Sequence, residues 1–161
     1  MTTIQAHAIP QERMAAIWRG GQDERGNPLQ PHRSAEAFPL RCCLTRSGPD
    51  TEIALISFSA MDRPLPWAEA GPVFVHADPC DGYADASLPA GLSTGPRVLR
   101  PYRTDGSMDY SGITVVEAGA DLEPVLSRLL EDPRRHEVHV RSHPAQCYTY
   151  RVTREGAAPL A

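Results

Sequence analysis

Residues 137–152 read EVHVRSHPAQCYTYRV, and this stretch decides the fold class. Valines alternate with polar residues at its start, which is the period of two expected of a β-strand with two different faces. Pro144–Gln146 then turns the chain, and CYTYRV returns with the same period. The sequence therefore predicts a β-hairpin over residues 137–152.

The two faces of this predicted hairpin differ in chemistry. Val138 and Val140 share one face, and the polar residues of the first strand share the other. On the returning strand, Tyr148, Tyr150 and Val152 are expected to alternate against Cys147, Thr149 and Arg151. The polar row is interpreted either as the solvated side of an edge strand or as a wall that binds an anion. It consists of Glu137, His139, Arg141 and His143.

Outward from the hairpin, the remaining elements are short and separated by turns. Two helices are predicted, at Pro10–Trp18 and at Asp121–Glu131, the second with Asp121 as its N-cap. Further strands are expected at Leu40–Thr45, Glu52–Ser59, Val73–His76, Arg97–Tyr102 and Ile113–Val116, with Glu52–Ser59 as a central strand. These elements predict an α+β fold, loop-rich, with two helices and a mainly antiparallel sheet of short strands.

Size and composition are those of an ordinary soluble domain. The chain has 161 residues, of which 41% are hydrophobic and 22% charged, so one domain over residues 1–161 is expected. A net charge of −4 argues against nucleic acid or an anionic membrane as the main partner. The chain has no apolar run long enough to span a membrane, and its start lacks the features of a secretory signal. Four cysteines without an export signal favour reduced thiols in a cytoplasm.

The chain contains sixteen arginines and no lysine, and this excludes some chemistry. Without lysine there is no Schiff base, so covalent pyridoxal-phosphate and Schiff-base aldolase chemistry are excluded. A nucleotide-binding P-loop is absent for the same reason. Recognition of an anion must therefore use arginine, backbone amides or helix N-termini.

The densest group of reactive side chains lies in HADPC, residues 76–80, where a predicted strand enters a turn. His76 would favour the thiolate of Cys80, and Asp78 would orient the histidine. This pattern predicts a catalytic site made of His76, Asp78 and Cys80. The alternative is that Cys80 packs as a small hydrophobic residue in an ordinary turn.

A zinc site is a second interpretation of the same residues. His76 and Cys80 form an H-x-x-x-C pair, and His143 and Cys147 form another. Together they would supply the two imidazoles and two thiolates that tetrahedral zinc accepts. Neither pair has the spacing of a familiar zinc knuckle, and the adjacent cysteines at 42 and 43 do not form one either.

Three residues are candidates for binding a small ligand. Arg141 would fork onto a carboxylate or phosphate, with His139 on the same strand face. Trp67 lies in a proline-rich loop that either packs against the core or frames a pocket beside His76. Glu69 would serve there as a base if it were desolvated.

Several segments together resemble a known family. PLRCCL, PWAEAGPVFVHADPC, VLRPYR and HVRSHPAQCYTYRV are similar to a bacterial domain-of-unknown-function family, number twelve-oh-three. The resemblance spans nearly the whole chain and implies a single bacterial domain of this size. It implies no activity, cofactor or catalytic residue.

Three classes of function therefore stay open. The first, which we favour, is a small-molecule enzyme or ligand-binding domain whose ligand is anionic if Arg141 is used. The second is a structural domain stabilised by zinc, and the third is a protein-interaction module without a site. Whether the protein is an enzyme is left open. Close packing of His76 against the predicted hairpin would support the first two classes.

Overall fold

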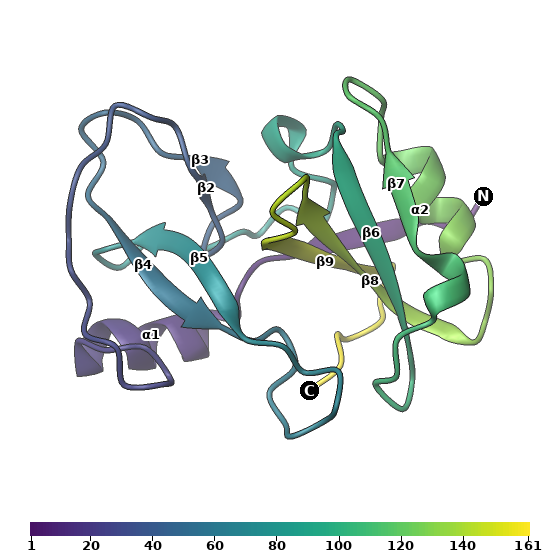
Figure 1. The fold of residues 1–161 in the computed structure, drawn as a ribbon, viewed down its shortest axis with the longest axis horizontal. Helices are drawn as coiled ribbons and strands as arrows, with labels where there is room; N and C mark the ends of the chain where they lie inside the picture. The colour runs from purple at the N-terminus through teal and green to yellow at the C-terminus, as the bar shows by residue number, and fades with distance from the viewer.

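The computed structural model describes all residues, 1–161, and contains two β-sheets that lie side by side (Figure 1). Its helices are α1 (Gln11–Gly20) and α2 (Glu123–Leu129), with short 3-10 turns η1 (Ala90–Leu92) and η2 (Tyr110–Gly112). The strands are β1 (Ile4–His7), β2 (Pro39–Leu40), β3 (Thr45–Arg46), β4 (Ile53–Phe58), β5 (Gly71–His76), β6 (Arg97–Arg103), β7 (Thr114–Val116), β8 (Arg135–Ser142) and β9 (Tyr148–Arg154). The predicted α+β class, with two helices and short strands, is confirmed. Neither helix has the length and apolar character needed to cross a bilayer.

The larger sheet has five strands in the order β1-β9-β8-β6-β7, and every pair is antiparallel. Its apolar face carries Val138 and Val140, as the alternation predicted, and packs against Leu126 and Leu130 from the α2 region. The predicted second helix is confirmed, although it begins two residues later than expected. The N-cap residue is Leu122 and not Asp121 as expected, but the Asp121 carboxylate still accepts a hydrogen bond from the Glu123 amide in the first turn (3.1 Å).

The register of the β8–β9 hairpin shifts by one residue near the turn. Val140 lies opposite Tyr150, yet Arg141 lies opposite Tyr148, so Thr149 is the extra residue of a β-bulge. Tyr148 and Tyr150 therefore point to opposite faces, and the expectation that they share a face is wrong. The bulge places the Tyr148 ring on the polar face of β8, where its centroid is 5.5 Å from that of His139.

The polar row of β8 is buried. Because β8 lies between β9 and β6, it is an internal strand, and the interpretation of its polar row as the solvated side of an edge strand is wrong. Glu137 has no exposed surface, and His139 and Arg141 are 2% and 8% exposed. His143 does not continue the row, since it lies in the exposed turn after the strand.

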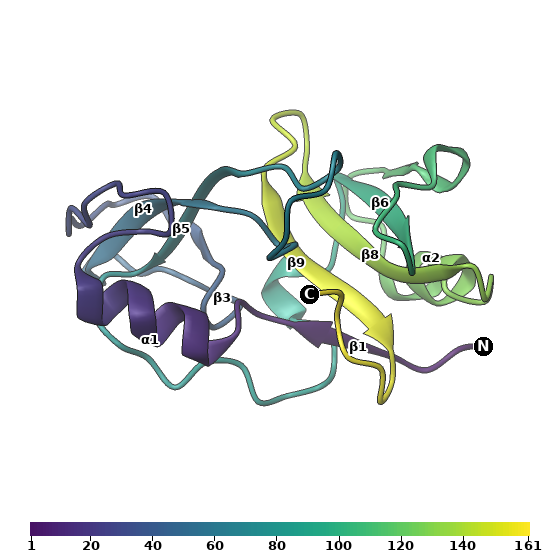
Figure 2. The same ribbon diagram turned by 90° about the horizontal axis from the view of Figure 1, so that it is seen from below.

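The smaller sheet has four strands in the order β3-β2-β5-β4. The strand predicted at Glu52–Ser59 is confirmed as β4, but it lies at the edge of this sheet and is not central. Residues 40–45 do not form one strand, because residues 41–44 make a tight turn between β2 and β3. The predicted first helix is α1, which lies along the smaller sheet in Figure 2. It buries Met14 and Ile17 in the same hydrophobic cluster as Ile56 and Phe58.

Side chains of the larger sheet reach into the smaller half of the molecule. Tyr148 is part of the hydrophobic cluster of the smaller half, and its backbone oxygen accepts a hydrogen bond from Arg41 Nε (2.8 Å). Arg151 Nη1 donates to the backbone oxygen of Ala60 (3.0 Å). The polar face of the larger sheet is thus closed by the smaller half, and a pocket remains where the two meet.

Candidate functional site

Three cysteines and one histidine meet at one end of the smaller sheet. One ligand atom from each of Cys42, Cys43, His76 and Cys80 lies within 4.8 Å of every other. Cys42 and Cys43 are buried, while His76 and Cys80 are half-buried, and none of the cysteines is in a disulfide.

The pairing of two strands explains why residues so far apart in sequence converge here. β2 and β5 run parallel, with Leu40 opposite Phe74, and the Arg41 amide donates to the Phe74 oxygen (2.9 Å). Two residues further along each strand, Cys42 therefore lies beside His76. The tight turn over residues 41–44 then brings Cys43 to the same place, and the turn after β5 returns Cys80.

Hydrogen-bonding groups face two of the three sulfur atoms. The His76 amide donates to Cys42 Sγ (3.3 Å), and Thr45 Oγ1 lies 3.1 Å from Cys43 Sγ. Such donors stabilise negative charge on sulfur, which is the form that binds metals and acts as a nucleophile.

The pKa values of the three thiols in the cluster are shifted in different directions. The hydrogen bond from Cys42, together with those from Thr45, lowers the pKa of Cys43 to about 5. The same hydrogen bond and burial raise the pKa of Cys42. Burial also raises the pKa of Cys80, so Cys43 is the thiol whose ionised form is favoured.

These four residues are a suitable ligand set for a soft divalent metal ion. Tetrahedral zinc with Zn–S distances of about 2.3 Å separates its sulfur ligands by about 3.8 Å. The observed separations, none above 4.8 Å, are within about an ångström of that value. Small side-chain rotations that move the ligand atoms by about one ångström would complete the tetrahedral coordination shell.

The structure brings together half of the metal set expected from the sequence. His76 and Cys80 are in the cluster, but His143 and Cys147 are not: His143 is in the exposed β8–β9 turn, and Cys147 lines a different pocket. Their places are taken by Cys42 and Cys43, which sequence reasoning set aside. The sequence carries no signal for them, because its pattern predicts one strand over residues 40–45. The parallel β2–β5 pairing that makes them neighbours of His76 is not visible in the sequence either.

Asp78 does not orient His76. Asp78 is exposed, and the side chain of neither residue has a hydrogen-bond partner in the structure. What holds this segment is instead the indole of Trp18, whose Nε1 donates to the backbone oxygen of His76 (2.9 Å). Gln11 Nε2 similarly donates to the Cys80 oxygen (2.8 Å). The catalytic role of His76, Asp78 and Cys80 stays a prediction.

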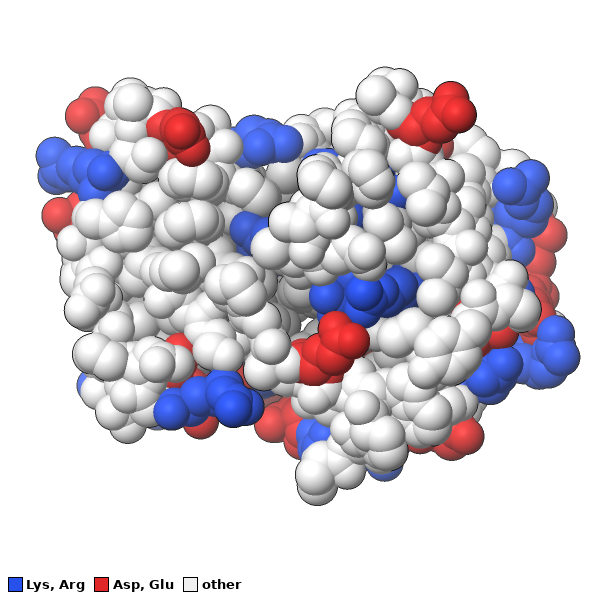
Figure 3. All heavy atoms as spheres, in the orientation of Figure 1, with Lys and Arg blue, Asp and Glu red and all other residues white.

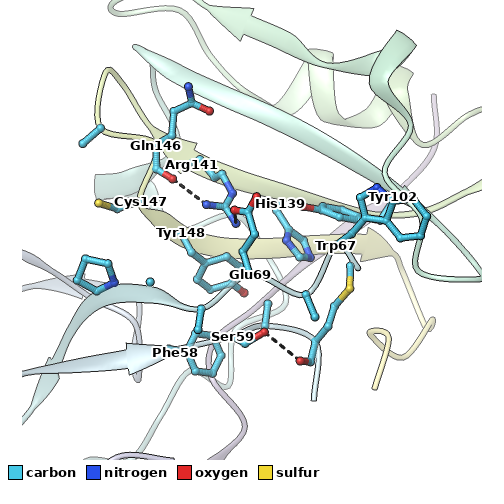
Figure 4. A pocket seen from close by; sticks show the side chains of 17 residues that line it. Phe58, Ser59, Trp67, Glu69, Tyr102, His139, Arg141, Gln146, Cys147 and Tyr148 are labelled. Carbon is cyan, nitrogen blue, oxygen red and sulfur yellow. Dashed lines mark hydrogen bonds and ion pairs between the residues drawn. The ribbon is translucent and has the colours of Figure 1, made fainter. Parts of the chain in front are cut away.

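A second group of functional side chains lines the pocket between the two sheets, where a cavity of about 100 Å³ remains. Figure 3 shows basic atoms in the hollow between the two halves, with an acidic group beside them. Figure 4 shows His139 and Arg141 facing the loop that carries Trp67 and Glu69. The residues labelled there are Phe58, Ser59, Trp67, Glu69, Tyr102, His139, Arg141, Gln146, Cys147 and Tyr148.

The three ligand-binding residues expected from the sequence lie together in this pocket. His139, Arg141 and Trp67 all line it, and Trp67 is half-buried against a cluster that includes Met61 and Tyr102. The Trp67 loop therefore frames a pocket, but not beside His76 as expected. The pocket lies at the Gly71 end of β5, whereas His76 is at the other end of the strand. The five residues between these ends span about 16 Å at the usual rise of a strand.

Behind the pocket, a buried carboxylate holds the histidine. Glu137 Oε1 lies 2.7 Å from His139 Nε2, and Glu137 Oε2 accepts from the Leu160 amide (2.7 Å). Arg151 Nη1 is 3.5 Å from the same carboxylate. Although burial opposes it, the hydrogen bond from His139 and the charge of Arg151 lower the pKa of Glu137, so Glu137 is ionised.

His139 itself is neutral in this setting. Burial lowers its pKa more than the hydrogen bond to Glu137 raises it. Since Nε2 donates to the ionised Glu137, the other ring nitrogen, Nδ1, carries the free lone pair. Nδ1 is buried and has no hydrogen-bond partner.

Residues 37–154 match the family described as "Protein of unknown function (DUF1203)", and the chain belongs to that family. Neither a curated protein nor a solved structure matches the chain. The matched region includes the four residues of the Cys/His cluster and the residues of the pocket between the sheets.

Proposed function

We propose that the protein is a zinc-binding domain in which Cys42, Cys43, His76 and Cys80 hold one zinc ion. The observation that carries the proposal is the mutual approach of the four ligand atoms, all within 4.8 Å. Two segments distant in the sequence, residues 42–43 and residues 76–80, supply them. A backbone amide and a hydroxyl group already face two of the three sulfur atoms of this set, those of Cys42 and Cys43.

The donor set favours zinc over other biological metals. Thiolate and imidazole ligands suit zinc, whereas calcium and magnesium require oxygen ligands. Three sulfur atoms and one nitrogen complete a tetrahedral shell and leave no open position for a substrate. We therefore propose a structural role, in which the metal fastens the turn at residues 41–44 to the end of β5 and to the segment after it.

This proposal excludes a nucleophilic role for Cys80 while the metal is bound. Coordination uses the sulfur and nitrogen lone pairs that a nucleophilic Cys80 and a basic His76 would need. It also requires reduced thiols, which fits the cytoplasmic location expected from the sequence. Because unfolded chains rarely contain a preformed site, the free energy of metal binding adds to the stability of the fold.

The test is the metal content of the purified chain and of two pairs of variants. Elemental analysis after purification without chelator should find about one zinc per chain. Cys80→Ser and His76→Ala should each lose most of it. Cys147→Ser and His143→Ala are matched controls outside the cluster, and both should retain the wild-type content.

Two results would contradict the proposal. The first is a metal-free wild-type chain whose melting temperature does not change in EDTA. The second is loss of zinc from the Cys147→Ser or His143→Ala control, which would return the site to the pairs first expected from the sequence. If the metal-free chain also contains a disulfide between Cys80 and Cys42 or Cys43, the cluster is a redox site.

A further inference from the structure

We propose that the pocket between the two sheets binds a small 2-hydroxycarboxylic acid, whose carboxylate pairs with Arg100 and Arg141 and whose hydroxyl donates to His139. The pocket lies at the other end of β5 from the Cys/His cluster, so this proposal does not rest on zinc binding. The side chain of Glu69 occupies the carboxylate position in the structure.

Two arginines share one carboxylate oxygen beside the pocket: Arg141 lines the pocket, and Arg100 lines an adjoining groove. Arg100 Nη1 is 3.1 Å and Arg141 Nη2 is 3.5 Å from Glu69 Oε2. The other oxygen of Glu69 has no polar partner. The arginine side chains are 15% and 10% exposed, but that of Glu69 is 52% exposed. The cations are therefore fixed, and the anion that pairs with them lies at the surface.

The two arginines carry more positive charge than this single carboxylate neutralises. The second carboxylate of the region, Glu137, is committed to His139, Arg151 and a backbone amide behind the pocket. Burial and the like charge of Arg100 lower the pKa of Arg141, which is consistent with a shortage of anionic partners. A ligand carboxylate that makes two parallel hydrogen bonds to an arginine fork would be held better than one shared oxygen.

Two buried polar atoms in residues that line this cavity lack partners. His139 Nδ1 is a free acceptor, because Nε2 donates to Glu137, and Arg141 Nε is a free donor. Both residues are more than nine-tenths buried and line the cavity. A buried polar group without a hydrogen bond destabilises the fold, so such atoms mark a place where a ligand group belongs. A carboxylate satisfies the donor, and an adjacent hydroxyl satisfies the acceptor.

The size of the cavity restricts the ligand. About 100 Å³ is the space of roughly three water molecules in the liquid. The aromatic rings of Tyr102 and Tyr148 limit it on two sides, with centroids 4.2 Å and 5.5 Å from that of His139. Glycolate and lactate have the required groups and are small enough, whereas a nucleotide or a peptide is not.

Titration calorimetry on the protein as purified tests the proposal with four probes. Glycolate or lactate should bind, and acetate should bind about tenfold more weakly, because it lacks the hydroxyl that His139 accepts. Inorganic phosphate is the fourth probe. Tighter binding of phosphate than of either hydroxy acid would overturn the assignment to a carboxylate.

Variants of the ion pairs separate binding from a purely structural role. Glu69→Ala removes the internal competitor and should strengthen lactate binding by at least several-fold. Arg141→Gln should weaken it at least tenfold, and Arg100→Gln serves the same purpose if the first variant does not fold. Arg134→Gln, whose arginine is 78% exposed and pairs elsewhere, should leave affinity unchanged. The proposal would be overturned if neither glycolate nor lactate binds. It would also be overturned if Glu69→Ala weakens the binding of lactate.

Discussion

Glu137 organises the polar face of the larger sheet, and it does so with no exposed surface of its own. It contacts His139, Arg151 and the amide of Leu160, so every group that could neutralise or solvate it is supplied by the fold. Burying a charge is costly unless it is paired and hydrogen-bonded. The C-terminal segment that carries Leu160 therefore completes the polar network behind the pocket between the two sheets.

The stability of the fold should decrease on acidification in two pH ranges, one set by His139 and one by Glu137. The folded chain holds His139 neutral, because burial lowers its pKa, while the unfolded chain takes up a proton near pH 6.5. The unfolded state then binds more protons, so the free energy of unfolding decreases by up to about 1.4 kcal/mol per pH unit and per proton. Glu137, whose pKa is also lowered, contributes stability above its unfolded pKa of about 4.3 and loses it as pH falls through the folded value.

Urea unfolding of the His139→Gln variant between about pH 6.5 and 5 tests the first range. The pH slope of its unfolding free energy should be smaller than that of the wild type. It should not vanish, because burial also lowers the pKa of His7. His143→Gln, in the exposed turn, is the control and should keep the wild-type slope. Equal slopes for wild type and His139→Gln would show that His139 is not buried in its neutral form.

Individual site residues could be predicted from the sequence where they belong to one strand. Alternation placed His139 and Arg141 on one face, and the structure confirms this. It did not reveal that the face is buried, because burial depends on the other sheet. Cys42 and Cys43 were missed for a related reason, since only the parallel pairing of β2 with β5 makes them neighbours of His76.

At the scale of elements, β4 offers an internal test of the fold. Residues on the two faces of this strand should contribute differently to the free energy of unfolding. Phe58 is 3% exposed and packs on Tyr148, whereas Leu55 is 48% exposed on the opposite face. Phe58→Ala should lower the free energy of unfolding by roughly 3–5 kcal/mol. Leu55→Ala, the matched control in the same strand, should lower it by less than about 1 kcal/mol. Similar losses in both variants, measured by urea unfolding, would mean that the strand has another register.

Elements with regular patterns were predictable, and those set by tertiary context were not. Both helices and the strands from β4 to β9 follow from apolar periodicity and turn residues. The edge position of β4 and the bulge at Thr149 do not, because strand order and a one-residue bulge leave no periodic signal. The turn at residues 41–44 has the sequence pattern of a strand, because Cys42, Cys43 and Leu44 are apolar and buried.

At the scale of the whole molecule, the two sheets should unfold together. Tyr148 belongs to the hydrophobic cluster of one half and to a strand of the other, and Arg41 and Arg151 hydrogen-bond across the junction. The chain has two tryptophans, Trp18 packed on the smaller half and Trp67 at the polar face of the larger sheet. In each of the variants Trp18→Phe and Trp67→Phe, the fluorescence of the remaining tryptophan should therefore give the same unfolding midpoint as far-UV circular dichroism of that variant. Two transitions, reported separately by the two tryptophans, would show that the halves are independent domains.

The central claim is that the four residues at the end of β5 hold a metal, and X-ray absorption at the zinc edge tests it most directly. We predict a four-coordinate shell with three sulfur atoms at about 2.3 Å and one nitrogen at about 2.0–2.1 Å. That shell would match Cys42, Cys43, Cys80 and His76. A shell of two sulfur and two nitrogen atoms, a shell made mainly of oxygen, or a protein purified without zinc would contradict the account.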